Sequence, residues 1–397
     1  MTAASKKIYT PQFWLLCLSS VLFFASFNMI IPELPDYLSE LGGPEYKGLI
    51  ISLFTVTAML SRPFSGKLAD SLGRKPVIMF GAAVCILCSA LYPLLSTVAG
   101  FLLLRLIHGF STGFSPTGVA AYVSDIVPAE RRGEAMGMVG TSGALGMAGG
   151  PALGGAVANQ WGLDVMFYVS SFLALASIVI FIRVRETLKE RHSVSWRLLK
   201  VSWADIYEPL VLAPCFVMML TAYAYGTVYT MLPDFGFTMG IKNKGLLFVY
   251  FTLASLFIRL IAGRASDMYG RVVILRVSVV MIILAMAVIG MAQTKWMLVL
   301  GVCMYGLGQG STSPTLLAWA TDLSDENFRG RAIACFYICM EFGIGLGAFC
   351  AGLIFANDTS NFFITFAPCM ILAAVAFVFL AMSYKEKIER RAIKPIS

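Results

Sequence analysis

The chain has 397 residues, of which 58% are hydrophobic and only 13% are charged, and its mean hydropathy is +0.79. A soluble protein carries a charged share of roughly 25%, so this composition excludes a soluble fold and places most of the chain in lipid. The net charge of +8 does not predict nucleic-acid binding, because the basic residues are distributed as in a membrane protein.

Twelve apolar runs are each long enough to cross a bilayer, which takes about 20 residues. The first six lie at 13–38, 46–68, 76–95, 99–124, 134–158 and 162–184. The second six lie at 209–237, 244–265, 272–292, 296–321, 330–356 and 361–384. We predict an all-α membrane protein with a six-helix bundle over 1–184, a cytoplasmic linker over 185–208, and a second six-helix bundle with a short cytoplasmic tail over 209–397.

The basic residues predict the orientation. With both termini inside, few of them fall in the outer segments, namely Lys47, Lys242, Lys244 and Lys295. Three arginines lie within helices (Arg62, Arg105 and Arg259), and the remainder face the cytoplasm, as the positive-inside rule requires. The first ten residues are too short and polar for a cleaved signal peptide. Short loops and the lack of targeting segments favour a bacterial inner membrane.

The cysteines and histidines do not indicate an enzyme. All nine cysteines fall inside predicted spans, and Cys85 and Cys88 have no second cysteine or histidine pair to complete a metal site. We therefore predict packing roles for them, no metal and no cofactor. The chain has only two histidines and no Gly-Lys-Ser/Thr phosphate loop, which argues against zinc chemistry and ATP hydrolysis.

The outer end of the first helix combines prolines with acids. Pro32 and Pro35 interrupt the helical hydrogen bonding. Glu33 lies deeper than Asp36, which is near the membrane boundary. The simpler interpretation of Asp36, and of Asp234 in the seventh helix, is that they cap helices at the water surface. Glu33 is the stronger functional candidate.

A charged stretch bounded by glycine, Gly66 to Lys75, is predicted to form a tight turn after the second helix. Gly66 and Gly73 permit close backbone approach or positive φ, while Asp70 is placed to cap the next helix and pair with Arg74 or Lys75. The pattern recurs 197 residues further on, at Gly263, Asp267, Gly270 and Arg271. This duplication favours a conformational gate over an ordinary polar loop.

Two polar residues stand within the fourth helix. Arg105 is predicted about two turns below the outer surface, at a depth comparable with Glu33, and a charge in lipid is a functional candidate by default. A purely structural ion pair is the alternative. His108 lies one turn deeper and either titrates near neutral pH or has a hydrogen-bonded packing role.

Loop charges follow the fourth helix and recur in the second half. Asp125 and Arg132 have counterparts 197 residues on, at Asp322 and Arg329. These charges can bridge to the turn at Asp70 and act as an inner latch.

The fifth helix is rich in glycine. Gly146, Gly150 and Gly154 are four residues apart and form one smooth strip on which another helix can lie. Pro151 adds a kink. Packing alone could explain a single glycine face, but the whole pattern is harder to dismiss; it comprises Gly137, Gly146, Gly150, Pro151, Gly154 and Gly155.

The second half offers further polar and aromatic candidates. Glu341 lies in the middle of the eleventh helix, where a charge is costly. It is either a titrating or cation-binding site, or a neutral acid in an internal hydrogen bond. Tyr223 and Tyr229 lie in the seventh helix, and Gln309 and Trp319 in the tenth.

The glycine-bounded turn over 66–75, its repeat and the two sets of six helices resemble the major facilitator superfamily over essentially the whole chain. Arg105-x-x-His108-Gly109 is similar to that family's helix-four motif, with His108 in place of the usual glutamine. The fifth-helix pattern resembles the motif of the drug and metabolite proton antiporters and is complete.

This resemblance implies two six-helix bundles related by an axis along the membrane normal, with a substrate site near mid-membrane at their interface. It implies that Asp70 locks onto the start of the eleventh helix when the inner gate is shut, and that the fifth-helix glycines block proton leakage. It also implies that Arg105 couples protonation of a carboxylate to substrate release. With the polar residues found within or near the membrane above, the candidate proton-coupling residues are Glu33, Asp36, Arg105, His108 and Glu341. The implied cavity residues are Phe27, Asn28, Tyr223, Tyr229, Gln309 and Trp319.

The resulting expectation is a secondary active transporter that exports a small amphipathic or cationic organic compound in exchange for protons. Its partners would be that substrate, protons and membrane lipids, with no nucleic acid, and we expect a monomer. A proton symporter or uniporter for a sugar or other metabolite uses the same scaffold, and a lipid transporter is a further alternative. A membrane-embedded enzyme is weaker, because no catalytic triad or metal cluster stands out.

Overall fold

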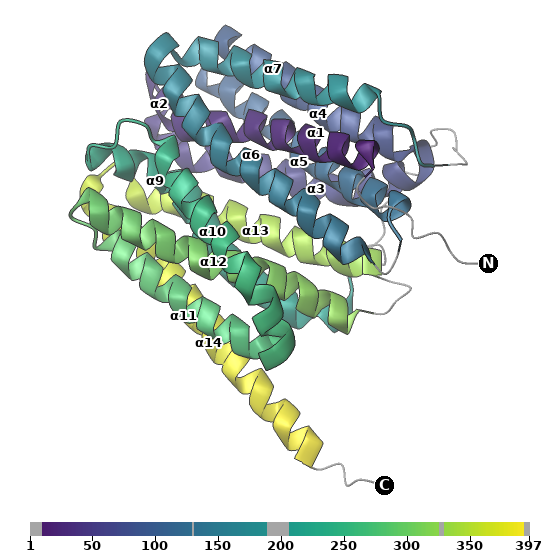
Figure 1. Ribbon diagram of the computed structural model, residues 1–397. Coiled ribbons are helices and arrows are strands. Elements are labelled where there is room, and N and C mark those ends of the chain that lie inside the picture. Colours follow the sequence, from purple (N-terminus) through teal and green to yellow (C-terminus); the bar gives the residue numbers. More distant parts are fainter. Residues whose placement is uncertain (1–9, 129–130, 189–205, 325–328, 393–397) are drawn as a thin grey trace. The chain divides into compact units, whose positions relative to one another are not determined.

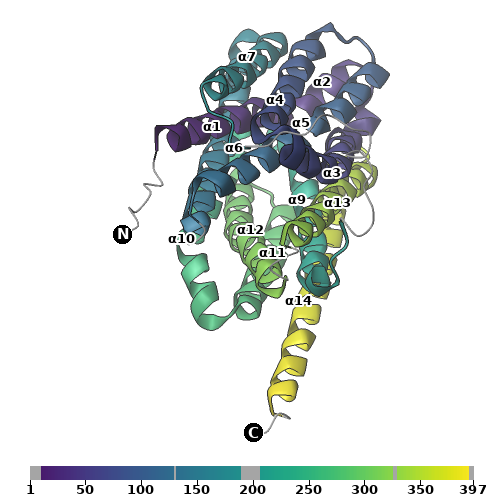
Figure 2. The same cartoon turned by 90° about the vertical axis from the view of Figure 1, so that its right-hand side faces the viewer.

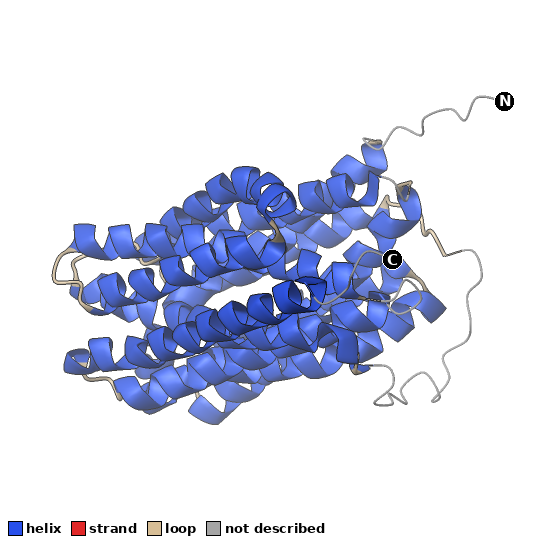
Figure 3. Cartoon of the chain, turned by 90° about the horizontal axis from the view of Figure 1, so that it is seen from below, coloured by secondary structure: helices blue, strands red, loops and turns tan. Residues whose placement is uncertain are grey.

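A computed structural model describes residues 10–128, 131–188, 206–324 and 329–392. All regular structure in these residues is helical (Figure 3). Most of the expected linker, 189–205, lies outside the described residues. The side chain of Arg132 also lies outside the description, although the residue begins a helix.

Twelve long helices are described, six in each half of the chain. The first half has α1 (Pro11–Ile30), α3 (Lys47–Leu72), α4 (Arg74–Leu91), α5 (Val98–Ile126), α6 (Arg132–Trp161) and α7 (Leu163–Ile182). The second half has α9 (Leu212–Thr238), α10 (Gly245–Tyr269), α11 (Arg271–Gly290), α12 (Lys295–Leu323), α13 (Arg329–Phe355) and α14 (Phe362–Ala392). The shorter segments are α2 (Leu34–Glu40) and the 3-10 turns η1 (Ile31–Glu33), η2 (Pro44–Tyr46), η3 (Tyr92–Leu94), η6 (Pro209–Val211) and η8 (Thr359–Asn361).

The chain divides into two compact units. Unit 1 comprises Met1–Asp205 together with Lys242–Val249, which includes the start of α10, and unit 2 comprises Ile206–Ile241 and Tyr250–Ser397. In Figure 1 the helices of the first half run from purple to teal and those of the second half from green to yellow. Figure 2 shows α14 continuing beyond the other helices of unit 2.

The two units repeat the same helix pairings, as expected for a duplicated chain. In unit 1, α1 packs against α6 and α7, and α4 packs against α5 and α7. In unit 2, α9 packs correspondingly against α13 and α14, and α11 against α12 and α14. Even the helix caps recur: Thr97 and Thr294, 197 residues apart, each accept a hydrogen bond at the start of α5 and α12.

Ten of the described helices are long and apolar enough to cross a membrane by length and composition. The two others, α6 and α12, span 30 and 29 residues. Their glycine, serine and threonine content lowers their hydropathy, because these helices carry small residues where neighbouring helices approach closely. With α6 and α12 the chain forms the expected all-α membrane fold of two six-helix bundles.

The helix ends near the prolines of the first span agree with the sequence, whereas the predicted turn over 66–75 needs a correction. The prolines after α1 end it at Ile30 and give the turn η1 and the short helix α2, as predicted. The predicted turn over 66–75 is shorter than expected, because α3 continues to Leu72 and only Gly73 leaves the helix, with φ 122°. Gly66 therefore lies inside α3, where an added Cβ would meet nothing within 4 Å. Its echo, Gly263, is likewise helical, and Gly270 takes the positive φ of 93°.

Candidate functional site

Arg105 lies on α5 inside unit 1 and is only 1% exposed. Its Nε donates to the carbonyl oxygen of Ile50 at 2.9 Å, and its Nη1 donates to the hydroxyl of Tyr92 at 3.3 Å. The guanidinium lies over the ring of Phe54 at 4.8 Å. The approach of α5 to α3 requires Gly109, because a Cβ there would lie 2.1 Å from the carbonyl oxygen of Phe54. Arg105 is thus a buried cation held by neutral partners.

One nitrogen of this guanidinium remains unused. Nη2 of Arg105 is buried and has no hydrogen-bond partner among the residues that the structure describes. Among the described residues, no acid lies within ion-pair distance of Arg105. A buried charge with an unsatisfied donor is expensive, so this conformation leaves Arg105 ready to accept an additional partner.

Donor and acceptor roles connect Arg105 to His108. An arginine only donates, so the Tyr92 oxygen accepts from Arg105 and its own proton is available to Nδ1 of His108, 3.2 Å away. The remaining proton of a neutral imidazole then lies on Nε2, which faces Sγ of Cys85 at 3.4 Å. Both ring nitrogens of His108 thus have partners within unit 1, which is the arrangement expected for a hydrogen-bonded packing role.

The polar chain continues across unit 1 to α7. Cys85 contacts the hydroxyl of Ser26 on α1 at 3.3 Å. The hydroxyl of Ser26 donates to the carbonyl oxygen of Ser170 at 2.8 Å. The hydroxyl of Ser170 donates to the carbonyl oxygen of Ser26 at 2.9 Å. Ser89 completes the cluster at 2.9 Å from Ser170. Cys85, predicted from the sequence as packing filler, is therefore a member of a buried hydrogen-bond network joining α1, α4, α5 and α7.

Glu33 lies apart from Arg105, in a second charged group of unit 1. It is 7% exposed, and its Oε1 has no hydrogen-bond partner in the described part of the chain. Asp36 forms an ion pair with Lys244, which is 3% exposed and lies in the segment before α10. Both Lys244 and Asp36 act electrostatically on Glu33. Sequence reasoning placed Glu33 as the nearest partner of Arg105, but this conformation does not bring the two into an ion pair.

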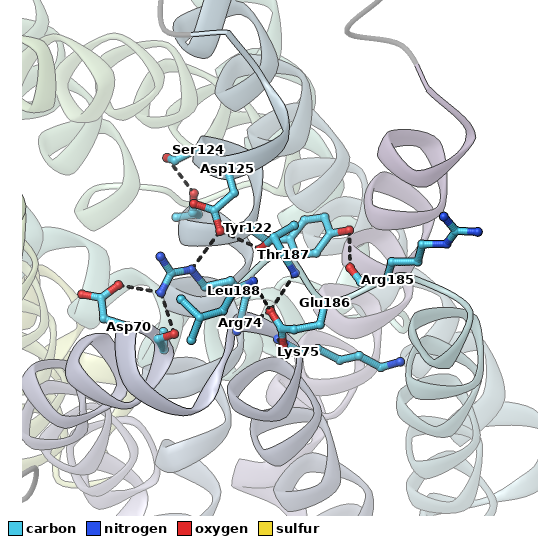
Figure 4. Close-up of polar contacts among 12 residues, drawn as sticks. Asp70, Arg74, Lys75, Tyr122, Ser124, Asp125, Arg185, Glu186, Thr187 and Leu188 are labelled. Atoms are coloured by element: carbon cyan, nitrogen blue, oxygen red, sulfur yellow. Dashed lines mark hydrogen bonds and ion pairs between the residues drawn. The ribbon is translucent and has the colours of Figure 1, made fainter. Parts of the chain in front are cut away.

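The charged turns form the same triad in both units. Arg74 pairs with Asp70 at 2.6 Å and with Asp125 at 3.0 Å, as Figure 4 shows. In unit 2, Arg271 pairs with Asp267 at 2.5 Å and with Asp322 at 3.0 Å. The first triad joins the end of α3, the start of α4 and the end of α5. The second joins the end of α10, the start of α11 and the end of α12. The sequence left Arg74 and Lys75 open as partners of Asp70 and expected the loop charges to bridge to Asp70. In the structure Asp70 pairs with Arg74, and Asp125 also pairs with Arg74.

Unit 1 has an additional anchor that sequence reasoning missed. Glu186, after α7, accepts hydrogen bonds from the backbone N–H groups of Arg74 and Lys75 at 3.1 and 3.0 Å (Figure 4). Burial acts to raise the pKa of Glu186, but these bonds and those from Leu188 and Thr187 outweigh burial and hold the pKa below its usual value. The carboxylate caps the N-terminus of α4, where a negative charge is favoured.

The glycine strip of α6 lies directly against α1. A Cβ at Gly146 would lie 2.4 Å from the carbonyl oxygen of Val21, and one at Gly154 would lie 2.0 Å from that of Met29. Gly137, by contrast, has nothing within 4 Å. Gly155 approaches Asn243 instead, whose amide donates to the carbonyl oxygen of Ala152 next to Pro151. The predicted smooth strip is therefore a backbone-to-backbone helix contact.

All six predicted cavity residues are buried. Asn28 donates to the carbonyl oxygen of Phe24 at 2.8 Å, and Phe27 stacks on Phe54 at 6.0 Å. Tyr223 and Trp319 are 5% and 9% exposed.

An aromatic cluster stands beside these residues in unit 2. Tyr229 stacks on Tyr225 at 4.2 Å and Phe251 stacks on Tyr305 at 5.3 Å. Gln309 on α12 is buried, and no described residue forms a hydrogen bond with its Oε1. Glu341 on α13 is 6% exposed. Unit 2 thus combines aromatic faces with buried polar groups.

Comparisons with known proteins agree with this architecture. The family model described as Major Facilitator Superfamily matches residues 16–287 and 215–395. The chain is 32% identical to multidrug resistance protein 2 of Bacillus subtilis over 231 residues, 54% of this chain and 57% of that relative. It is 26% identical to multidrug resistance protein MdtG of Salmonella arizonae over 332 residues, 80% of this chain and 81% of that relative.

A solved structure has the same fold at low sequence identity. The crystal structure of a D-xylose–proton symporter superposes with a TM-score of 0.75, covering 93% of this chain and 96% of that one at 15% identity. The duplicated charged turns, the glycine strip between α6 and α1 and the family match over most of the sequence have one common explanation: this chain belongs to the major facilitator superfamily of membrane transporters.

Proposed function

We propose that this transporter exports a small amphipathic or cationic organic compound in exchange for protons. The observation that carries the proposal is Arg105, a buried cation with neutral partners and an unused Nη2 donor. The multidrug-resistance relatives support an export role at low identity. The complete glycine pattern of α6, which resembles that of proton antiporters, supports exchange over symport.

The proposed coupling uses Glu33 as the acid nearest in depth to Arg105. When Glu33 is ionised, a conformation that brings it to the unused Nη2 of Arg105 is favoured, because a buried cation gains most from a charged acceptor. When Glu33 is protonated, that attraction is lost and the conformation described here, with the two groups apart, is favoured. A proton entering from outside thereby shifts the balance between states.

Further residues act with this pair in the proposal. Asp36 and Lys244 set the charge around Glu33, His108 holds the orientation of Tyr92, and Glu341 on α13 is the alternative acid that takes up the proton. The aromatic and polar residues described above bind the organic substrate, with π faces for a cation and Gln309 for a polar group. The two arginine triads act as inner gates, and Asp70 is proposed to lock onto the start of α13 when the gate is shut.

We further propose a bacterial inner-membrane location with both termini in the cytoplasm and a monomeric transporter. The arginine-rich loops support this orientation through the positive-inside rule. Cysteine accessibility in intact cells, using a single cysteine introduced at an outer position such as Lys295, tests it. Labelling by an impermeant reagent supports the orientation, and protection of that position contradicts it.

The coupling is tested in proteoliposomes loaded with a fluorescent amphipathic cation. Transport should follow an imposed pH gradient, with the substrate moving against the direction of the protons. Transport in the same direction as the protons would indicate symport, and transport indifferent to the gradient would contradict proton coupling.

Arg105→Ala is expected to abolish this transport while the protein still elutes as a folded species. The matched control is Arg183→Ala, an exposed arginine at the end of α7, which should transport normally. Full activity of Arg105→Ala would remove Arg105 from the mechanism.

A further inference from the structure

Three cysteines from two distant parts of the chain meet in unit 2. Cys215 lies in the first turn of α9, while Cys335 and Cys339 lie one turn apart on α13. Their three sulfur atoms lie within 4.8 Å of one another, and Cys215 Sγ is 3.8 Å from Cys335 Sγ. All three are free thiols. The sequence could not reveal this cluster, because 120 residues separate Cys215 from Cys335.

The sulfur spacing suits one shared metal ion. A zinc–sulfur bond is about 2.3 Å long, so two sulfurs bound to the same ion lie about 3.8 Å apart in a tetrahedral site and about 4.0 Å apart in a trigonal site. The sulfur atoms of Cys215 and Cys335 are 3.8 Å apart, which equals the tetrahedral value. The sulfur of Cys339 lies within 4.8 Å of the other two, so it is within reach of an ion bound between them.

The surroundings favour three ligands and no fourth. Cys215 and Cys335 are 1% and 7% exposed, whereas Cys339 is partly exposed and offers an entry point. Glu208 is the nearby acid, but its carboxylate is occupied by Arg331, whose Nη2 donates to it at 2.5 Å. Within the described residues, no other histidine, cysteine or acid joins the group.

The chemistry of three thiolates selects the ion. Soft sulfur ligands prefer Cu(I), zinc and similar thiophilic ions over hard cations. Structural zinc usually takes four protein ligands, so a three-sulfur site fits Cu(I) better. The location at the N-terminal part of α9 also favours negative sulfur, because the helix dipole is positive there.

We propose that Cys215, Cys335 and Cys339 bind one thiophilic d10 cation, Cu(I) in preference to Zn²⁺, through three thiolates. Binding displaces the three thiol protons to solvent. The bound ion joins the first turn of α9 to α13, two helices that otherwise meet through glycine contacts such as Gly343 against Met219. This inference is independent of the transported substrate and of proton coupling.

The test uses the purified full-length protein in detergent, kept reduced, with Cd²⁺ and Cu(I) as the probes. Cd²⁺ should produce sulfur-to-cadmium charge-transfer absorption that saturates at one equivalent. Competition with a chromophoric Cu(I) chelator gives the Cu(I) affinity, which should fall at least ~100-fold in Cys335→Ser, since loss of a ligand exceeds the loss of a supporting group. Zn²⁺ should bind more weakly than Cu(I).

Cys303→Ser is the matched control, because Cys303 is a partly exposed cysteine on α12 outside the cluster. It should retain the full signal and affinity. Unchanged affinity in Cys335→Ser, or no charge-transfer signal in the unmodified protein, would show that the three thiols only pack together.

X-ray absorption on the Cu(I)-loaded unmodified protein provides a readout that does not depend on a variant folding. Three sulfur neighbours support the site, and fewer than three overturn it. Alkylation of Cys339 should also slow when Cd²⁺ is bound, and an unchanged rate would contradict the proposal.

Discussion

At the scale of single residues, the central feature is how a charged side chain is kept in a membrane helix. Arg105 uses a carbonyl oxygen, a phenol and an aromatic face, and Tyr92 is the shared partner that connects it to His108. Tyr92 is completely buried, so no water replaces its hydroxyl group if it is removed. The tyrosine is therefore as important to the site as the arginine, although no sequence motif includes it.

Tyr92→Phe is expected to destabilise the protein by about 1–3 kcal/mol, because it leaves donors of Arg105 and an acceptor of His108 unsatisfied in a buried site. Thermal unfolding of the purified protein in detergent measures the change. Tyr168→Phe, at a tyrosine that is 50% exposed on α7, is the control and should unfold as the unmodified protein does. Equal unfolding temperatures for both variants would contradict the network.

Glu186 predicts a dependence of stability on pH. Because its pKa is lowered in the folded protein, its carboxylate contributes stability that is fully present above its unfolded-state pKa and is lost as the pH falls through the lower folded-state value. Glu186→Gln should therefore be less stable at neutral pH, by about 1–2 kcal/mol given its partial exposure. The difference should shrink in acid, and unfolding measured across pH checks this. A constant difference at every pH would be inconsistent with the carboxylate cap.

At the scale of helices, close packing in each unit depends on small residues. The strip on α6 approaches α1 so closely that backbone meets backbone, and α13 repeats this against α9 at Gly343 and Gly347. Helices in lipid gain little from hydrophobic burial against one another, so such close contacts supply the packing energy. Substitutions in the strip should therefore act on helix packing rather than on chemistry.

Gly150→Ala and Gly149→Ala form a matched pair on neighbouring positions of α6. A Cβ at Gly150 would lie 2.6 Å from the carbonyl oxygen of Ala25, whereas one at Gly149 would meet nothing within 4 Å. Gly150→Ala should destabilise by about 1–3 kcal/mol through overpacking. Gly149→Ala should be neutral or stabilise by up to about 1 kcal/mol, because alanine is the better helix former. Thermal unfolding compares them, and the reverse order would contradict the packing described here.

At the scale of the whole molecule, the two units share an architecture but are not identical. The arginine triads around Arg74 and Arg271 match, and among the described side chains a carboxylate, that of Glu186, bonds the N-terminus of the following helix in unit 1 alone. A Cβ at Gly73 would lie 2.4 Å from Glu186, whereas Gly270 has nothing within 4 Å. Among the described residues, the turn of unit 1 thus has a contact with Glu186 that is not seen at its repeat.

The gating role proposed for the triads predicts that transport and stability respond differently. The side chains of Asp70 and Asp267 are 72% and 66% exposed, so Asp70→Asn and Asp267→Asn should each change stability by less than about 1 kcal/mol. Asp70→Asn should nevertheless slow transport severalfold, since it weakens the inner gate. Measuring transport in proteoliposomes and thermal unfolding on the same preparations separates the effect on transport from the effect on stability. Loss of stability in proportion to loss of flux would point to folding instead.

Sequence alone determined the class and the internal repeat. Composition and the length of the apolar runs require membrane helices, and the recurrence of Asp70 and Arg74 as Asp267 and Arg271 marks the duplication. The spacing of Gly146, Gly150 and Gly154 predicted a close helix contact. These features are local or periodic, so they can be recognised without knowing which helices are neighbours.

Only the tertiary structure decided which distant side chains meet. It gave Arg105 the partners Ile50 and Tyr92 instead of Glu33, and it brought Cys215 to Cys335. Such contacts depend on how helices rotate and pair, and many pairings satisfy the same hydropathy pattern. The length of the apolar runs determines which segments cross the membrane. Close packing and hydrogen bonding determine which helices lie next to one another.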